Sequence, residues 1–417
     1  MPDIAVIGGG AAGLTAAIFA AREGASVSLY EKNEKVGKKL YITGKGRCNF
    51  TNLCDTQQFL SKVMRNPRFL YSALNCLSPE DMIALIEENG CRTKVERGQR
   101  AFPVSDKASD ITRALLRAAE GVGARIITHQ GVRSLRFSFA GGRPAVSGLE
   151  LESGDTAEPG AVIIATGGLS YPSTGSTGDG YVFAGKAGHH VLPRYPSLTG
   201  VNTEETWPAG LQGLSLKNVR LELKKDGRRV RSALGEMLFT HYGVSGPLIL
   251  EMSSVLSGEV LTGYQMHLDM KPALSVEQLE RKYVSETALS GKKTVRHYLE
   301  SLLPKAMAPV VCALESIPDT ARMIDLGAAQ RKKLLEKLKD LTLTPSALRP
   351  FSEAVVTRGG VDVKEVEPGT MRSRLVTNLY FAGEVLDVDA LTGGFNLQIA
   401  FATGALAGKS AADALLR

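Results

Sequence analysis

The sequence of 417 residues predicts an α/β fold built around a parallel β-sheet. Three observations indicate this class. A strand, a glycine-rich turn and a helix open the chain, a second strand follows at once, and two later buried strands each end in glycine. The length suits two or three domains. The composition, 43% hydrophobic and 22% charged residues, excludes a disordered chain.

The opening residues form a complete β-α-β unit, with strands expected over residues 4–7 and 26–30 and a helix between them that ends near Gly24. The turn before the helix fits the pattern G-x-G-x-x-G, and its residues are Gly8, Gly10, Ala11, Ala12 and Gly13. The first glycine permits a tight turn, the second lets the backbone approach a pyrophosphate, and the third allows close packing of helix on strand. The helix N-terminus then offers N–H groups to an anion.

Glu31 closes the second strand, where a carboxylate can accept hydrogen bonds from both ribose hydroxyls of an adenosine. A 2′-phosphate would be repelled there, which argues against NADP at this site. A glycine-rich turn in an ordinary sheet would not explain the acid. The unit therefore predicts a dinucleotide site.

Two later strands favour FAD over NAD. Residues 161–168 form a buried strand that runs into Ala165, Thr166 and Gly167, and residues 378–384 form another that ends in Gly383 and Glu384. Both resemble signatures of FAD enzymes, the second being the strand whose acid holds the ribityl chain. Because Glu replaces the usual Asp, either Glu384 or the nearby Asp387 could take that role.

A glycine turn at residues 391–396 feeds a helix of small residues near the C-terminus, and Gly394, Phe395 and Asn396 lie at its start. Such a helix could point its N-terminus at the flavin edge where negative charge develops on reduction. The alternative is a helix that only packs in the core.

The chain resembles the BaiN-like flavoproteins, a family that includes an aminoacetone oxidase and a bile-acid 3-oxo-4-ene reductase. The matching stretches are residues 37–52, 100–105, 171–180, 239–247, 359–361 and 383–396. The resemblance implies an FAD-dependent oxidoreductase that transfers hydride through flavin N5. It also implies FAD contacts beyond the glycine turns, from Lys32, Lys39, Gly46, Arg47, Cys48, Asn49 and Val132.

The resemblance further implies a Rossmann-like FAD-binding domain of the two-dinucleotide-fold type that is interrupted by an insertion. We expect the FAD domain over residues 1–195 and 355–417, a β-rich insertion over 196–272 and a helical insertion over 273–354. The patterning agrees, because polar and apolar residues alternate over 219–224, Asp226-Gly227 predicts a hairpin turn, and helical spacing runs from residue 275 to 343.

Four residues are candidates for the chemistry. Lys45 and Arg47 could stabilise the reduced flavin or polarise a substrate carbonyl, although they could equally bind FAD phosphate or hold their loop. His241 is the candidate general acid or base, with Tyr242 second, although a histidine that orders a turn explains the position as well. Cys48 fits a buried structural cysteine better than a redox-active one. The sequence shows no metal-ligand pattern.

The expected substrate is a small or medium organic molecule, such as a 3-oxo-4-ene steroid or bile acid reduced with NADH or NADPH. The sequence carries no second strand-GxGxxG-helix unit, so this donor would bind transiently at the flavin face. Two alternatives remain: an amine oxidase that passes electrons to oxygen, and a flavin-containing RNA-binding or tRNA-modifying protein. The basic stretch 217–231 and the net charge of +7 permit the RNA-binding alternative. The basic stretch has no aromatic residue, however, which argues against a stable nucleic-acid partner. We expect a cytoplasmic protein without a membrane partner.

Overall fold

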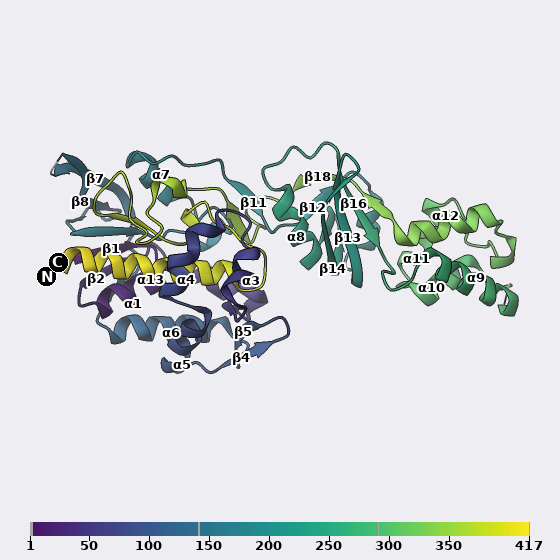
Figure 1. Cartoon of the computed structure of the whole chain (residues 1–417), viewed down its shortest axis with the longest axis horizontal. Helices are drawn as coiled ribbons and strands as arrows, with labels where there is room; N and C mark the ends of the chain where they lie inside the picture. Colours follow the sequence, from purple (N-terminus) through teal and green to yellow (C-terminus); the bar gives the residue numbers. More distant parts are fainter. Residues whose placement is uncertain (1–2, 141, 291, 417) are drawn as a thin grey trace. The chain divides into compact units, whose positions relative to one another are not determined.

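The structure is a computed structural model that describes residues 3–140, 142–290 and 292–416 (Figure 1). The chain forms two compact units. Unit 1 combines the residues up to Ser197 with those from Phe351 onward, and unit 2 comprises Leu198–Pro350. The boundaries expected from the sequence, 195/196, 272/273 and 354/355, stay predictions.

Unit 1 is built on a five-stranded parallel sheet with the order β20-β10-β1-β2-β6, which confirms the predicted fold class. Its strands are β1 (Asp3–Ile7), β2 (Ser26–Tyr30), β6 (Arg125–Ile127), β10 (Ala161–Ile164) and β20 (Leu379–Phe381). Ile7 pairs with both Tyr30 and Ile164, and Ile164 pairs with Phe381. Tyr30 also pairs with Ile127, so all five strands end at one edge of the sheet.

Two helices that are far apart in the sequence pack closely in unit 1: α1 (Ala11–Arg22) and α13 (Phe395–Leu416) (Figure 1). A Cβ atom on Gly404 would lie 2.2 Å from the carbonyl oxygen of Ala12, and one on Gly408 would lie 2.2 Å from that of Ala16. The small residues of α13 thus serve backbone-to-backbone packing. By length and composition α13 could cross a membrane, but 61% of its most apolar window is buried inside the protein, as in a core helix.

The rest of unit 1 surrounds this sheet. Its other helices are α2 (Lys38–Ile42), α3 (Thr56–Ser61), α4 (Tyr71–Cys76), α5 (Pro79–Glu88), α6 (Ala108–Gly121) and α7 (Asp179–Lys186). Three small antiparallel sheets complete it: β3 (Thr51–Asn52) with β5 (Arg100–Pro103) and β4 (Thr93–Glu96), β7 (Val132–Ala140) with β8 (Arg143–Leu151) and β9 (Thr156–Ala157), and β11 (Tyr195–Ser197) with β19 (Val356–Arg358).

Unit 2 contains a seven-stranded antiparallel sheet with the order β17-β16-β13-β14-β15-β12-β18. Its strands are β12 (Val201–Thr203), β13 (Ser215–Lys225), β14 (Arg228–Thr240), β15 (Gly243–Ser245), β16 (Tyr264–Asp269), β17 (Leu341–Leu343) and β18 (Pro345–Leu348). The predicted hairpin is confirmed, because Lys225 pairs with Arg228 across a two-residue turn in which Asp226 has φ 49° and Gly227 has φ 76°.

Helices complete unit 2: α8 (Pro247–Leu256), α9 (Val276–Ser290), α10 (Val295–Leu302), α11 (Met307–Leu314) and α12 (Ala328–Lys339). The helical stretch ends earlier than the spacing predicts, because residues 341–343 pair with β16 as strand β17. The two units have separate hydrophobic cores.

Candidate functional site

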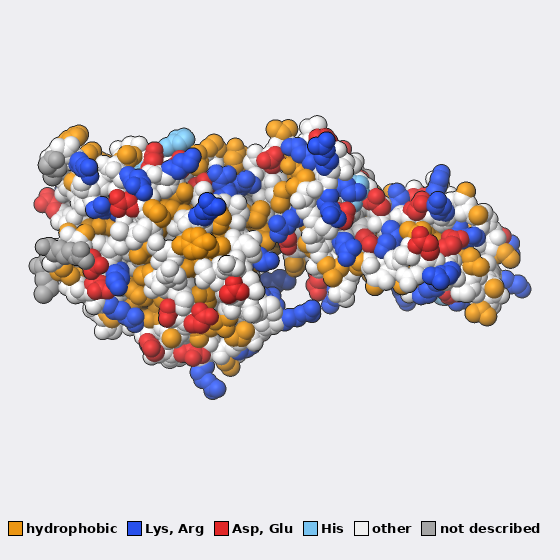
Figure 2. Space-filling view, in the orientation of Figure 1, with side chains coloured by type: hydrophobic (Ala, Val, Ile, Leu, Met, Phe, Trp, Pro, Cys, Tyr) orange, Lys and Arg blue, Asp and Glu red, His pale blue; other side chains and the backbone are white. Residues whose placement is uncertain are grey.

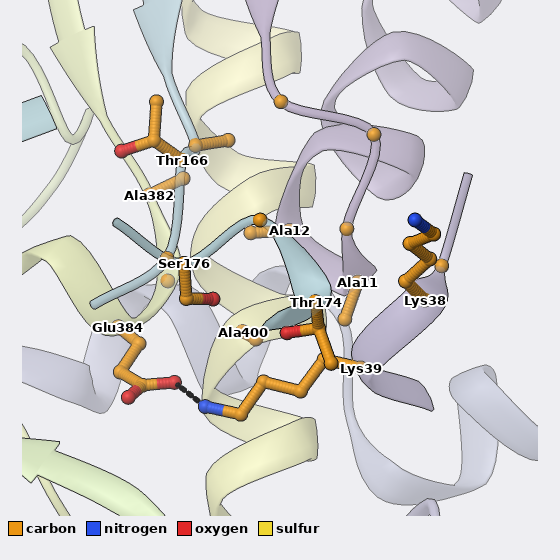
Figure 3. Close-up of a pocket in the computed structure, with 18 of the residues that line it drawn as sticks. Ala11, Ala12, Lys38, Lys39, Thr166, Thr174, Ser176, Ala382, Glu384 and Ala400 are labelled. Atoms are coloured by element: carbon orange, nitrogen blue, oxygen red, sulfur yellow. Dashed lines mark hydrogen bonds and ion pairs between the residues drawn. The ribbon is translucent and has the colours of Figure 1, made fainter. Parts of the chain in front are cut away.

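A cavity of about 1310 Å³, counting the space at its open mouth, lies in unit 1 where the parallel strands end (Figure 3). The residues that directly follow β1, β2, β10 and β20 line it: Gly8 to Ala12, Glu31 to Asn33, Ala165 to Gly167, and Ala382 to Glu384. Ligands of open α/β sheets bind outside the carboxyl ends of the strands. The fold thus brings together four segments that the sequence keeps far apart.

The three glycines of the turn have different steric surroundings. Gly8 has φ 103°, and a Cβ atom there would lie 2.6 Å from the carbonyl oxygen of Ala165. A Cβ atom on Gly13 would lie 1.8 Å from the carbonyl oxygen of Gly8, so this glycine seats α1 against the turn and does not line the cavity. A Cβ atom on Gly10 would meet open space, because this residue faces the cavity.

Glu31 is held in a fixed position at the end of β2, where it is 8% exposed. Its Oε2 atom accepts a hydrogen bond from the Gly9 amide at 2.8 Å, and Oε1 accepts from the amide and the side chain of Asn33 at 2.8 and 2.6 Å. The contact with Gly9 ties the acid to the glycine turn. A ribose that binds beside α1 would meet a carboxylate that is already oriented.

Glu384 and Lys39 form an ion pair within the cavity, with Nζ 2.6 Å from Oε2 (Figure 3). The other carboxylate oxygen, Oε1, accepts from Ser170 Oγ at 2.7 Å and from the Thr357 amide at 2.8 Å. Burial alone would raise the pKa of Glu384, but the Lys39 ammonium and these hydrogen bonds hold the pKa below its ordinary value. The Glu384 carboxylate therefore accepts hydrogen bonds from three donor groups of the chain.

Asp387, the alternative acid, does not line the cavity. Its carboxylate forms a bidentate pair with Arg65, with Nε 2.8 Å from Oδ1 and Nη2 2.8 Å from Oδ2. Asn66 Nδ2 also donates to Oδ2, at 3.0 Å. Of the two acids left open by the sequence, the geometry favours Glu384 as the residue that faces a ribityl chain.

The lysines of the cavity are all paired. Lys32 Nζ lies 2.6 Å from Asp179 Oδ2, and Lys38 Nζ lies 2.8 Å from Glu34 Oε2. Together with Lys39 they line the same cavity as the N-terminus of α1, which has no acidic residue in its first turn. This end of the cavity suits a phosphate.

The start of α13 borders the cavity through Asn396, whereas Gly394 and Phe395 do not line it. The Asn396 side chain does not face a ligand, because Oδ1 accepts from the Ala390 amide at 2.9 Å and Nδ2 donates to the Ala390 carbonyl at 2.7 Å. Phe395 packs edge-on against Phe59. Position 394 requires glycine because the backbone of Thr51 lies close to it: a Cβ atom there would lie 2.5 Å from the carbonyl oxygen of Thr51.

In the loop from Thr43 to Asn49, Thr43 lines the cavity and the later residues do not. An ion-pair network holds the loop in place. Arg47 Nε lies 2.8 Å from Asp106 Oδ1, its Nη2 atom pairs with Glu96, and its guanidinium lies over the Phe102 ring at 4.3 Å. The geometry therefore favours the structural interpretation of Arg47 over the catalytic one. Gly46 extends the left-handed turn that this loop makes, with φ 85°.

Lys45 and Cys48 differ sharply in exposure. Lys45 is exposed and adopts φ 58°. Cys48 is completely buried, and burial raises the pKa of its thiol to about 12. A thiolate is thus disfavoured at Cys48, which supports a structural cysteine. Beside it, Asn49 carries a buried Oδ1 atom without a hydrogen-bond partner among the described residues, and a Cβ atom on Gly394 would lie 3.0 Å from this oxygen.

His241 and Tyr242 belong to unit 2 and have no part in the cavity of unit 1. His241 is exposed and contacts the Tyr242 ring edge-on at 5.0 Å between centroids. The guanidinium of Arg349 lies over the Tyr242 ring at 4.2 Å. His189 lies outside the strands and is buried, and its Nε2 atom lies 2.7 Å from Ser373 Oγ.

Several cavity residues were not anticipated individually. They are Ile7, Gly9, Tyr30, Asn33, Gly37, Lys38, Leu40, Thr43, Gly131, Thr174, Gly175, Ser176, Asp179, Phe183, Val355, Val356, Ala382, Val388, Leu397, Ile399 and Ala400. The predicted Val132 joins them as part of an apolar wall. The glycine cluster over residues 175–180 was the available signal for one of these segments, since Gly175 and Gly178 adopt φ 103° and 88°.

The residues present fit FAD. One end of the cavity offers the Glu31 carboxylate to a ribose, the α1 N-terminus and nearby lysines suit the pyrophosphate, and Glu384 and the start of α13 lie at other walls of the same cavity. The open face of Gly10 leaves room for the phosphates.

Comparisons with known proteins agree with this site. A family model described as the HI0933-like protein Rossmann domain matches residues 2–410. The chain is 32% identical to the 3-dehydro-bile acid delta(4,6)-reductase of Clostridium scindens, over 99% of this chain and 100% of that protein. It is also 32% identical to the ribosomal RNA dihydrouridine synthase of Haemophilus influenzae, over 95% of each protein.

A solved structure shares the fold at low sequence identity. The 3-ketosteroid-delta4-(5alpha)-dehydrogenase from Rhodococcus jostii RHA1 has a TM-score of 0.52 at 14% identity, and the match covers 99% of this chain and 96% of that one. The resemblance to BaiN-like flavoproteins is confirmed, and the chain is an FAD-dependent oxidoreductase. Because the family model matches nearly its whole length, the chain belongs to the HI0933-like Rossmann family.

Proposed function

We propose that this enzyme reduces a C=C bond conjugated to a carbonyl group, with NADH or NADPH as the electron donor. The observation that carries the proposal is the similarity along nearly the whole chain to two relatives whose names describe this kind of reaction. In a 3-dehydro bile acid with a delta-4 double bond, the C3 carbonyl is conjugated to that bond. Dihydrouridine is uridine whose C5–C6 bond, conjugated to the C4 carbonyl, is saturated.

The chain's own residues have definable tasks in this reaction. When bound, FAD supplies hydride transfer through its N5 atom. Glu31 would orient the ribose, the α1 N-terminus and Lys39 would balance the phosphate charge, and Glu384 would accept hydrogen bonds from the ribityl chain. Strands β1, β2 and β20 precede the α1 turn, Glu31 and Glu384 in the same sheet, which keeps the cofactor's reactive part in one position.

The first substrate candidate is a small or medium 3-oxo-4-ene compound of the steroid or bile-acid type. The relative from Clostridium scindens supports it, since that protein is matched along its full length. In this proposal the enzyme binds the substrate as a free small molecule and needs no nucleic-acid partner.

The second candidate is a uracil base within RNA, favoured by a basic surface on unit 2. Lys224, Lys225, Arg228 and Arg229 flank the β13–β14 turn, and the register places Lys224 opposite Arg229 and Lys225 opposite Arg228. Lys224 and Arg228 form no ion pair with any residue that the structure describes. Figure 2 shows Lys and Arg side chains over the strands of unit 2. Such a surface suits a phosphate backbone.

Anaerobic half-reactions test the proposal. The purified holoenzyme is mixed with NADH or NADPH, and bleaching of the flavin absorbance is followed. The reduced enzyme is then mixed with a 3-oxo-4-ene steroid or with ribosomal RNA, and reoxidation and product mass are measured. We expect a product that gains two hydrogens. Failure of both nicotinamides to bleach the flavin, together with bleaching by aminoacetone, would instead establish an amine oxidase.

A further inference from the structure

A second pocket lies in unit 1, apart from the cofactor cavity; it is open to solvent and spans about 650 Å³ including its mouth. Four segments form its walls. They are β3 and the residues after it (Asn52, Cys54), α3 and the residue after it (Gln58, Lys62), the β4–β5 turn with the start of β5 (Gly98, Gln99, Arg100), and the turn before α13 with its first residue (Thr392, Gly393, Phe395). None of these residues lines the cofactor cavity, and Phe395 alone among them is predicted from the sequence to contact FAD.

The two hollows share one short stretch of chain. Thr392, Gly393 and Phe395 face the second pocket, whereas Asn396 and Leu397, which follow directly, face the cofactor cavity. Asn52 fixes this arrangement, because its Nδ2 atom donates to the carbonyls of Gly98 and Gly393 at 3.0 Å each. A molecule in the second pocket therefore lies against the turn that borders the cofactor.

The pocket carries positive charge without a compensating acid. Lys62 and Arg100 both line it, and no Asp or Glu does so among the residues that the structure describes. Lys62 and Arg100 also form no ion pair with any described residue, although Arg100 Nε donates to the Arg97 carbonyl at 3.0 Å. Unpaired cations on two walls of one hollow suit an anionic ligand, and arginine suits phosphate in particular.

The uncharged polar side chains narrow the class of ligand. Gln58, Gln99 and Thr392 line the pocket, and their side chains form no hydrogen bond with any residue within the described ranges. An amide and a hydroxyl group both donate and accept hydrogen bonds, which is what the hydroxyls of a sugar require. Cations beside such groups match a ribose phosphate.

We propose that this second pocket binds the ribose-phosphate part of NADH or NADPH while the nicotinamide reaches the flavin. The inference rests on the proposed function, which requires a nicotinamide donor. The sequence has no second G-x-G-x-x-G unit that could bind this donor. In this proposal, side chains of the second pocket bind the donor in place of a second Rossmann unit.

The test compares charged and uncharged donors on the FAD-loaded enzyme. Lys62→Ala, Arg100→Ala and the double variant are reduced anaerobically with NADH, with NADPH and with 1-benzyl-1,4-dihydronicotinamide, which has neither ribose nor phosphate. Lys186→Ala is the matched control, because it removes an exposed cation of unit 1 at the end of α7 that lines neither hollow. The rate of flavin bleaching is measured against donor concentration.

We expect each single substitution to raise the half-saturating concentration of NADH or NADPH about tenfold, and the double variant to raise it further. The limiting rate, the FAD content and reduction by the benzyl compound should stay unchanged, and Lys186→Ala should match the unmodified enzyme. Unchanged half-saturation in the double variant overturns the pocket assignment while leaving the reductase proposal intact. If the unmodified enzyme is bleached by the benzyl compound but by neither NADH nor NADPH, the donor itself is wrong and both proposals fall. Weakened RNA binding with unchanged NADH and NADPH kinetics would assign the pocket to RNA phosphate and also overturn it.

Discussion

Lys39 Nζ lies 2.6 Å from Glu384 Oε2, which joins α2 to the third residue after β20 across 345 positions of the sequence. The pair sits inside the cofactor cavity, where both side chains are at most one quarter exposed. A buried pair of this kind costs more when one partner is removed than when both are replaced, because the remaining charge is left without compensation.

A double-mutant cycle on this pair should show strong coupling. We expect Glu384→Gln or Lys39→Met alone to lower the free energy of unfolding by about 3 kcal/mol, and the double variant to recover part of that loss. FAD affinity should fall in all three variants, since both side chains line the cavity. Chemical denaturation of the FAD-free proteins and FAD titration check this. Additive losses would show that the pair is not coupled.

The pH dependence of this stabilisation follows from the lowered pKa of Glu384. A carboxyl group whose pKa is lower in the folded chain than in the unfolded one stabilises the fold above its unfolded pKa. That contribution is lost as the pH falls through the folded value. The stability difference between the unmodified protein and Glu384→Gln should therefore be full at neutral pH and shrink in acid below pH about 4.5, the ordinary pKa of a glutamate. A constant difference down to pH 3 would contradict it.

Replacement by alanine should affect stability at one glycine of this turn and FAD binding at another. A Cβ atom on Gly13 would lie 1.8 Å from the Gly8 carbonyl oxygen, so Gly13→Ala should displace α1 and lower the melting temperature of the FAD-free protein. A Cβ atom on Gly10 meets no atom within 4 Å, so Gly10→Ala should fold normally but intrude on the phosphate position and weaken FAD binding about tenfold or more. Thermal denaturation and FAD titration separate the two effects, and equal behaviour of the two variants would refute this division of roles.

The Cys48 thiol should not react with thiol reagents in the folded enzyme. This thiol is completely buried, and its pKa of about 12 leaves it protonated at neutral pH. In the folded enzyme it should therefore resist a thiol reagent that labels the half-buried Cys76, and Cys48→Ala should keep its turnover rate. Peptide mapping after labelling identifies the modified residue. Rapid labelling of Cys48, or loss of turnover without loss of FAD, would restore a redox role.

The sequence predicts this fold well where local geometry dictates the residue. Gly8 and Gly13 could be assigned their roles because each position has a steric requirement that only glycine meets, whereas the role of Gly10 follows from the G-x-G-x-x-G pattern, which places a phosphate beside it. The pairing of Arg47 with Glu96 and Asp106 could not be foreseen, because it joins residues about 50 or more positions apart through a small sheet whose register the sequence does not encode locally. The choice between Glu384 and Asp387 likewise depends on Arg65, which lies 322 residues before Asp387.

The hairpin of unit 2 offers a prediction in which stability and binding move in opposite directions. The register places Lys225 directly opposite Arg228 and Lys224 opposite Arg229, and like charges facing each other across two strands destabilise a sheet. Replacing Lys224 and Arg228 by Gln should therefore raise the melting temperature slightly at low salt, with the gain vanishing at high salt as the repulsion is screened. If RNA is the substrate, the same variant should bind ribosomal RNA more weakly, and the dependence of binding on salt concentration should become less steep by about two charges. NADPH oxidation with a small 3-oxo-4-ene compound should not change. An unaltered RNA affinity and salt dependence would remove the hairpin from RNA recognition and leave the small-molecule substrate as the favoured one.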